Sequence, residues 1–250
     1  MFSRICAAII FFTRLPLWRV VTPPPEAYRR VVELWPLAGW VTGGTAAIAL
    51  WCAAQVFPPA AAAAVALGLR AFLTGGLHDD GLADWWDAMG GGHSRERILE
   101  IMKDSRTGTY GVLGLLVYYL LTVTLLTGFT PAVGAAVLMS ADVWSKCCAA
   151  QIINSLPYAR SELTAKSHTV YSPMSLGARA CALLLGLLPA ALLLPAALLP
   201  ALAAPVAVTA LCIATMRRSI GGYTGDCCGA TALMCEPAMM ALALICQKCL

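Results

Sequence analysis

Residues 180–216 read ACALLLGLLPAALLLPAALLPALAAPVAVTALCIATM, a run without an acidic or basic side chain. A membrane-spanning helix needs about 20 consecutive apolar residues, so this run is long enough for two. Pro195 and Pro200 stand near its middle, where a chain that crosses a bilayer twice would turn. The run therefore predicts a helical hairpin.

The same pattern occurs twice more, at Leu34–Leu69 and Thr107–Ala141, with breakers at Pro58-Pro59 and at Gly128 and Pro131. Helices are expected because lipid offers no partners for backbone polar groups. The predicted spans are 34–57, 59–77, 110–128, 131–152, 179–195 and 200–216, and the Ala-rich segment 229–246 is a short candidate seventh. The expected fold class is all-α: a polytopic transmembrane helical bundle of six or seven spans, with short interfacial helices on the cytoplasmic face. Residues 1–250 form one domain.

The composition agrees with a membrane protein. Hydrophobic residues make up 60% of the chain and charged residues 12%, against about 25% charged in soluble domains. A soluble domain and a disordered chain are both excluded. We expect membrane lipid, but no nucleic acid, among its partners.

The basic residues predict the orientation. The predicted hairpin tips carry no Lys or Arg, whereas the opposite ends carry almost all of them, which makes those ends cytoplasmic. The basic residues at these ends are Arg4, Arg14, Arg19, Arg29, Arg30, Arg95, Arg97, Lys103, Arg106, Arg160, Lys166, Arg217 and Arg218. The N-terminal apolar stretch is short and has no cleavage site, which favours an interfacial or re-entrant helix over a signal peptide.

The acidic residues are concentrated between the second and third predicted spans. Of thirteen acids, seven lie in 79–104. In a helix, Asp80, Asp84 and Asp87 would share one face at spacings i, i+4 and i+7. Three carboxylates packed together repel one another unless a cation lies among them, and hard oxygen ligands suit Mg²⁺. The alternative is a solvated acidic loop, but apolar residues and glycines interleave with these aspartates.

Two further polar segments are expected on the same face. Lys103-Asp104-Ser105-Arg106 offers cations that could bind a phosphate, although anchoring of the third span explains the cations equally well. In 217–226, the glycines would let backbone N–H groups approach a phosphate or nucleotide, and Asp226 could add a metal ligand. Within the predicted spans, Asp142 and Lys146 are expected to neutralise each other at spacing i, i+4.

These segments together resemble the cobalamin synthase family, the adenosylcobinamide-GDP ribazoletransferases of vitamin B12 assembly. The resemblance runs in order from about residue 8 to 245. Its motifs are Phe12-Thr-Arg-Leu-Pro16, Trp35-Pro-Leu-Ala-Gly39, His78-Asp-Asp-Gly-Leu-Ala-Asp84 with Asp87, Met102-Lys-Asp-Ser-Arg106 with Gly108 and Gly111, and Gly221-Gly-Tyr-Thr-Gly-Asp226 with Gly229-Ala230. The two middle motifs are the specific ones.

The resemblance implies a reaction. A ribose hydroxyl of α-ribazole, or of its 5′-phosphate, attacks the cobinamide-side phosphate of adenosylcobinamide-GDP, and GMP leaves. It implies Mg²⁺ as cofactor and a site on the cytoplasmic face of a bacterial or archaeal cytoplasmic membrane. Self-association, or association with other cobalamin-assembly enzymes, is compatible with it.

The resemblance also implies residue roles. The metal ligands would be Asp80, Asp84, Asp87 and Asp226. The catalytic residues would be Asp80, Asp84, Asp87 and His78, with the proton acceptor either an Asp or His78. The substrate-binding residues would be Lys103, Asp104, Ser105, Arg106, Gly222, Thr224, Gly225 and Arg14.

The chain departs from the family pattern at Asp79, at the bulky Trp85-Trp86 pair and at 142–146, so no function is assigned to the last segment. Three other protein classes share part of this pattern. A CDP-alcohol phosphotransferase would have an Arg soon after Asp80-Gly81, and an intramembrane prenyltransferase a second Asp-rich motif. A transporter would place its key charges at mid-membrane in broken helices, whereas here they are expected at helix ends.

Overall fold

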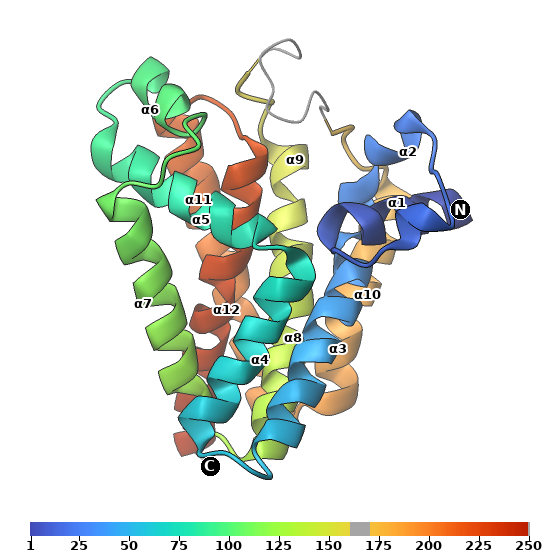
Figure 1. Cartoon of the computed structure of the whole chain (residues 1–250), viewed down its shortest axis with the longest axis vertical. Helices are drawn as coiled ribbons and strands as arrows, with labels where there is room; N and C mark the ends of the chain where they lie inside the picture. The colour runs from blue at the N-terminus through green and yellow to red at the C-terminus, as the bar shows by residue number, and fades with distance from the viewer. Residues whose placement is uncertain (161–170, 250) are drawn as a thin grey trace.

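The computed structural model describes residues 1–160 and 171–249, and these residues form helices and no β-sheet, which confirms the all-α prediction. Figure 1 shows long helices side by side and short helices gathered at one end of the bundle. We call this the polar end. The long helices are α3 (Trp35–Ala53), α4 (Pro59–Thr74), α7 (Thr109–Leu126), α8 (Pro131–Ala150), α10 (Leu176–Leu193), α11 (Ala203–Ser219) and α12 (Gly225–Lys248).

The polar end carries the remaining helices, which are α1 (Phe2–Phe12), η1 (Leu17–Arg19), α2 (Pro25–Tyr28), η2 (Val31–Leu34), α5 (Leu77–Gly91), α6 (Arg95–Ile101) and α9 (Ile152–Ser155). The turn η4 (Ala196–Leu202) precedes α11. Helix α1 lies beside α2 and does not cross the bundle, in line with an interfacial helix (Figure 1). One of the basic residues used for the orientation, Lys166, lies outside the described residues.

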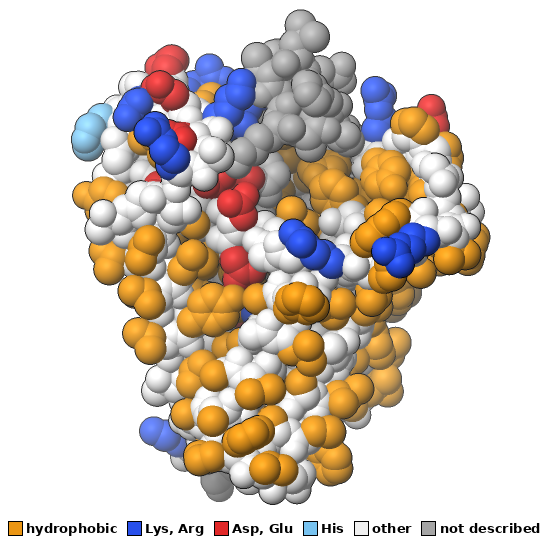
Figure 2. Space-filling view, viewed as in Figure 1, with side chains coloured by type: hydrophobic (Ala, Val, Ile, Leu, Met, Phe, Trp, Pro, Cys, Tyr) orange, Lys and Arg blue, Asp and Glu red, His pale blue; other side chains and the backbone are white. Residues whose placement is uncertain are grey.

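Among the described residues, six helical segments are long and apolar enough to cross a membrane. They are Val31–Ala53, Thr109–Leu126, Pro131–Ser155, Leu176–Leu193, Ala196–Ser219 and Gly225–Lys248. A seventh span is possible only if α4 and α5, which meet at a bend of 95°, count as one. Figure 2 shows apolar side chains around the lower part of the molecule and charged ones around the polar end.

Several predicted bounds differ from the structure, and the first predicted span, 34–57, ends at Ala53. The segment predicted as a span at 59–77 ends at Thr74, because two glycines in left-handed conformation follow it, and at 16 residues it is not by itself one of the six candidate spans. The span predicted at 200–216 begins at Ala196, since Pro195 precedes its first turn and Pro200 is accommodated in 3₁₀ geometry. The segment predicted as short, 229–246, is part of the 24-residue α12, whose first turn is capped by the Thr224 side chain.

The corner between α4 and α5 directs α5 across the polar end of the bundle. Gly75 and Gly76 have φ of +66° and +68°, a region that glycine enters without the Cβ penalty. A Cβ on Gly75 would lie 2.1 Å from Nε of Arg14, so the arginine packs directly over the corner. The backbone N–H of Arg14 also donates to the Leu73 carbonyl at 2.7 Å.

A buried network of charged side chains lies within the bundle. The predicted pairing of Asp142 with Lys146 is confirmed, at 2.5 Å between Nζ and Oδ1. The sequence did not predict that Arg70 from α4 would join Asp142 at 3.1 Å and Glu236 of α12 at 2.7 Å. Tyr118 of α7 donates to Glu236 at 2.6 Å. Two cations therefore face two anions, and α4, α7, α8 and α12 are tied together.

Candidate active site

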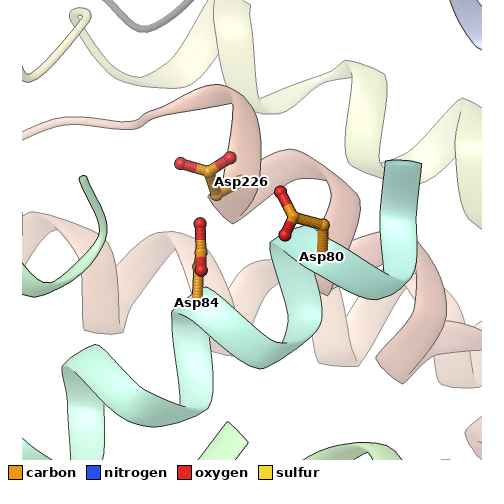
Figure 3. A group of neighbouring side chains, drawn as sticks. All are labelled: Asp80, Asp84 and Asp226. Atoms are coloured by element: carbon orange, nitrogen blue, oxygen red, sulfur yellow. The ribbon is translucent and has the colours of Figure 1, made fainter. Parts of the chain in front are cut away.

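Three carboxylates converge at the polar end. Asp80 and Asp84 lie one turn apart on α5, and Asp226 lies in the first turn of α12, so that one ligand oxygen from each lies within 4.8 Å of the others. Figure 3 shows Asp80 and Asp84 directed toward Asp226 on the neighbouring helix. We call these three residues the aspartate triad. Asp80 is exposed, Asp84 is buried and Asp226 is intermediate.

The local sequence explains how α12 reaches α5. Gly81 lies between the two triad residues of α5, and a Cβ there would lie 2.9 Å from the Asp226 carbonyl oxygen. Only a glycine lets the start of α12 approach this closely. The Thr224 side chain accepts a hydrogen bond from the Cys227 N–H at 3.3 Å, which fixes where α12 begins and therefore where Asp226 lies.

The residues present fit a divalent cation. All three donors are hard carboxylate oxygens from two helices, and this is the ligand type that Mg²⁺ prefers. Three carboxylates this close would repel one another without a counter-charge. The open side of Asp80 leaves room for water and phosphate oxygens, which Mg²⁺ usually retains among its ligands.

A cavity of about 250 Å³ opens beside the triad, with Asp80 and Asp226 in its wall. Aromatic rings form much of the remaining wall: Phe11, Phe12, Trp35, Tyr158 and Tyr171. Gly225 and Arg160 also line it. We call this the aromatic cavity.

His78 belongs to the wall of the aromatic cavity. Trp35 Nε1 donates to His78 Nε2 at 3.2 Å, and the rings of Phe12 and Trp35 stack at a centroid distance of 5.2 Å. Burial lowers the pKa of His78 to about 3, so the imidazole is neutral at physiological pH. With Nε2 already accepting a hydrogen bond, His78 is placed to position Trp35, and the geometry does not favour it as proton acceptor.

Asp87, predicted as a metal ligand and catalytic residue, lies apart from the triad. Its Oδ2 accepts from the Gly108 N–H at 2.6 Å and its Oδ1 from the Gly111 N–H at 2.8 Å. The carboxylate therefore satisfies backbone donors at the start of α7, where a helix N-terminus favours a negative charge. The geometry gives Asp87 a structural role and does not bring it into the triad, and its predicted part in catalysis stays a prediction.

Lys103, Asp104, Ser105 and Arg106 lie between α6 and α7 and, apart from partly covered Asp104, are exposed. Arg106 pairs with Asp104 at 2.7 Å, and its hydrogen bonds lower the pKa of Asp104 to about 2. Lys103, Asp104 and Arg106 line a groove with Asp87 and Arg97. This groove, which we call the basic groove, is separate from the aromatic cavity.

A family model described as cobalamin-5-phosphate synthase matches residues 4–245 of this sequence. The chain belongs to this family.

Several curated proteins named adenosylcobinamide-GDP ribazoletransferase are similar to this family member. One from Leptothrix cholodnii is 40% identical, with 92% of this chain and 90% of that protein covered. Those from Shewanella baltica and Shewanella oneidensis are 34% and 33% identical, with 92% of this chain and 88% of each protein covered. No solved structure matches the chain.

The glycine-rich segment at 221–226 contributes to the site only in part in this family member. A Cβ on Gly222 would lie 2.5 Å from the Pro157 carbonyl oxygen, so the space beside it is filled by the chain at 157–159. The Tyr223 N–H donates to Pro157, and the Ala159 N–H donates to Tyr223. Gly222 thus serves chain packing and Thr224 the helix cap. Gly225 lines the aromatic cavity, together with Asp226 and with Gly229 from the same motif.

Arg14 lies away from the aromatic cavity but beside Asp80, in a second groove that also contains Asp79 and Thr107. Sequence reasoning missed Arg160, which it used only as an orientation signal, and gave no role to Trp35, Tyr158 or Tyr171. Scattered aromatic residues have no spacing that predicts a shared wall. The only sequence signal for Arg160 was its place among the basic residues at the predicted cytoplasmic ends of the spans.

Removing one oxygen acceptor from Asp87 should affect stability rather than metal binding. In Asp87→Asn the amide group can serve only one of the two N–H donors, so we expect a loss of about 1–3 kcal/mol in the free energy of unfolding. Thermal melts of the purified chain measure this loss. Glu96→Gln, at an exposed position in the first turn of α6, is the matched comparison and should leave the melting temperature close to that of the wild type. A melting temperature for Asp87→Asn equal to that of the wild type would contradict the capping role.

Proposed function

We propose that this chain is a Mg²⁺-dependent adenosylcobinamide-GDP ribazoletransferase. It transfers the cobinamide-phosphate group to α-ribazole or its 5′-phosphate, and the products are adenosylcobalamin or its 5′-phosphate and GMP. The observation that carries the proposal is the meeting of Asp80, Asp84 and Asp226 beside a cavity, in a member of this family. The names of its relatives supply the reaction.

The chemistry requires a phosphorus centre to be held and its charge neutralised, because phosphoryl-group transfer depends mainly on positioning and electrostatics. Asp80, Asp84 and Asp226 would hold Mg²⁺, which when bound polarises the pyrophosphate and stabilises the leaving GMP. Lys103 and Arg106 would supply positive charge for phosphate oxygens, as the resemblance to the family implies. Arg106 must break its pair with Asp104 to do so.

In the reaction, the ribose hydroxyl oxygen forms a bond to the cobinamide-side phosphorus, and the bond from that phosphorus to the bridging oxygen of GMP breaks. GMP carries away the electron pair of the broken bond. The hydroxyl proton passes to a carboxylate of the triad and from there to water. We assign it to a carboxylate because Nε2 of His78 is held by Trp35.

We also propose that the polar end faces the cytoplasm, because the described basic residues gather there and the opposite end carries few. The site would then meet its soluble substrates on that side. The apolar helices would then serve to hold the site residues at this face of the membrane.

Direct assay tests the proposal. Purified full-length chain in detergent or nanodiscs is incubated with adenosylcobinamide-GDP, α-ribazole and Mg²⁺, and the products are separated by chromatography. We expect GMP and a cobalamin in equal amounts, and no product when EDTA removes the cation. Consumption of a CDP-alcohol substrate with no cobalamin formed would establish the rival phosphotransferase instead.

A further inference from the structure

The aromatic cavity has a composition that indicates its ligand. Five of its lining residues are Phe, Trp or Tyr, and further apolar side chains, among them Val32 and Leu77, also line it. Such walls bind flat aromatic groups, because a ring buried between rings gains stacking and loses water. The wall also carries polar side chains, among them His78, Asp80, Arg160 and Asp226, which can fix the polar part of a ligand whose apolar part lies against the rings.

Arg160 supplies an unused donor in this wall. Its Nη2 donates to the Leu99 carbonyl at 2.9 Å, whereas its buried Nη1 has no hydrogen-bond partner among the described residues. A buried donor without a partner is costly, so a ligand oxygen that reaches Arg160 Nη1 would be favoured. The cavity therefore combines stacking rings with one cationic donor and, at Asp80 and Asp226, direct access to the triad.

We propose that the aromatic cavity binds the acceptor nucleoside, with its apolar aromatic base against the rings and an oxygen of its ribose or 5′-phosphate on Arg160. This inference rests on the proposed function and assigns one of its two substrates to a place in the molecule.

The two substrates of the proposed reaction place different demands on a pocket. A guanine base carries several hydrogen-bonding atoms on its edge, and burying these against aromatic walls would leave them unpaired. A dimethylbenzimidazole base, as in α-ribazole, has one ring-nitrogen acceptor and no exocyclic hydrogen-bonding group, so it loses far less there than guanine does. The rings of the wall accordingly favour the apolar base of the acceptor over the guanine of the donor.

The separation between the base and the reacting atom in each substrate supports the same assignment. In the acceptor, only the ribose separates the base from the attacking hydroxyl, whereas in the donor a ribose and an additional phosphate separate guanine from the reacting phosphorus. The aromatic cavity adjoins the triad directly. The basic groove, with Arg97, Lys103 and Arg106, has the positive charge that the diphosphate end requires.

Steady-state kinetics of the full-length chain test the assignment with Phe11→Leu and Tyr171→Leu, which remove a ring but keep an apolar side chain. We expect the KM for α-ribazole to rise about tenfold, the loss typical of one stacking partner, with the KM for adenosylcobinamide-GDP unchanged. The control is Tyr110→Leu, which removes a ring from the basic groove and should leave the KM for α-ribazole unchanged. A rise in the KM for adenosylcobinamide-GDP alone, or no rise in either, would overturn the assignment.

A binding measurement separates failure of this inference from failure of the proposed function. Isothermal titration of the wild-type chain with α-ribazole, and separately with guanosine, needs no turnover. We expect α-ribazole to bind, guanosine not to bind, and Phe11→Leu to weaken α-ribazole binding about tenfold. If the wild type binds α-ribazole in this way but forms no cobalamin, the function fails and the cavity assignment stands. If it forms cobalamin and Phe11→Leu binds α-ribazole as tightly as the wild type, only the assignment fails.

Discussion

Asp226→Asn is expected to lower kcat of the transferase reaction roughly a thousandfold. The substitution removes the only triad carboxylate that comes from α12. A catalytic metal contributes several kcal/mol of charge stabilisation, and about 1.4 kcal/mol corresponds to each factor of ten in rate. The assay is GMP release at saturating concentrations of both substrates and Mg²⁺.

The matched control for Asp226→Asn is Glu96→Gln. Glu96 also lies in the first turn of a helix, α6, but is exposed and outside the triad. Glu96→Gln removes one negative charge near a helix N-terminus, as Asp226→Asn does, so it measures any general effect of losing that charge. Equal activity in Asp226→Asn and Glu96→Gln would show that Asp226 has no part in the reaction.

The second large effect is expected in the buried network. Arg70→Met should lower the free energy of unfolding by about 3–5 kcal/mol, since it leaves Glu236 buried without its cation. Thermal melts in detergent measure the change. Arg217→Met, at an exposed position at the end of α11, is the control and should leave the melting temperature close to that of the wild type.

A double variant makes this prediction more specific. Arg70→Met combined with Glu236→Met removes one cation and one anion, and the pair of Asp142 and Lys146 remains. Replacing a whole buried ion pair by apolar side chains costs far less than removing one partner. The double variant should therefore melt above Arg70→Met. A double variant less stable than both single variants would show that the charges themselves stabilise the bundle.

The sequence predicted those features that depend on composition and local spacing. Long apolar runs predict helices wherever lipid excludes other structures, and a spacing of four places Asp80 and Asp84 on one face of α5. Local spacing could not separate Asp84 from Asp87, because both lie on that face. What distinguishes them is the partner across the bundle: Asp226 for one, and the N–H groups of Gly108 and Gly111 for the other.

The features that the sequence could not predict depend on contacts between distant segments. Glu236 lies 166 residues from Arg70, and nothing in its apolar surroundings indicates the pairing. The aromatic cavity likewise draws on α1, α3, α5, α12 and the segments at 158–160 and 171. Helix α5 contributes Leu77, His78 and Asp80 to the wall because the corner at Gly75 and Gly76 directs it across the bundle.

The central claim is that Asp80, Asp84 and Asp226, without Asp87, hold the divalent cation. Titration with Mn²⁺, followed by electron paramagnetic resonance of the free ion, measures binding to the full-length chain without substrate or turnover. We predict that the wild type and Asp87→Asn bind Mn²⁺ with the same Kd. We predict that Asp226→Asn binds at least about tenfold more weakly, since even the partners of metal ligands contribute that much. Unchanged binding in Asp226→Asn, or loss of binding in Asp87→Asn, would contradict the claim.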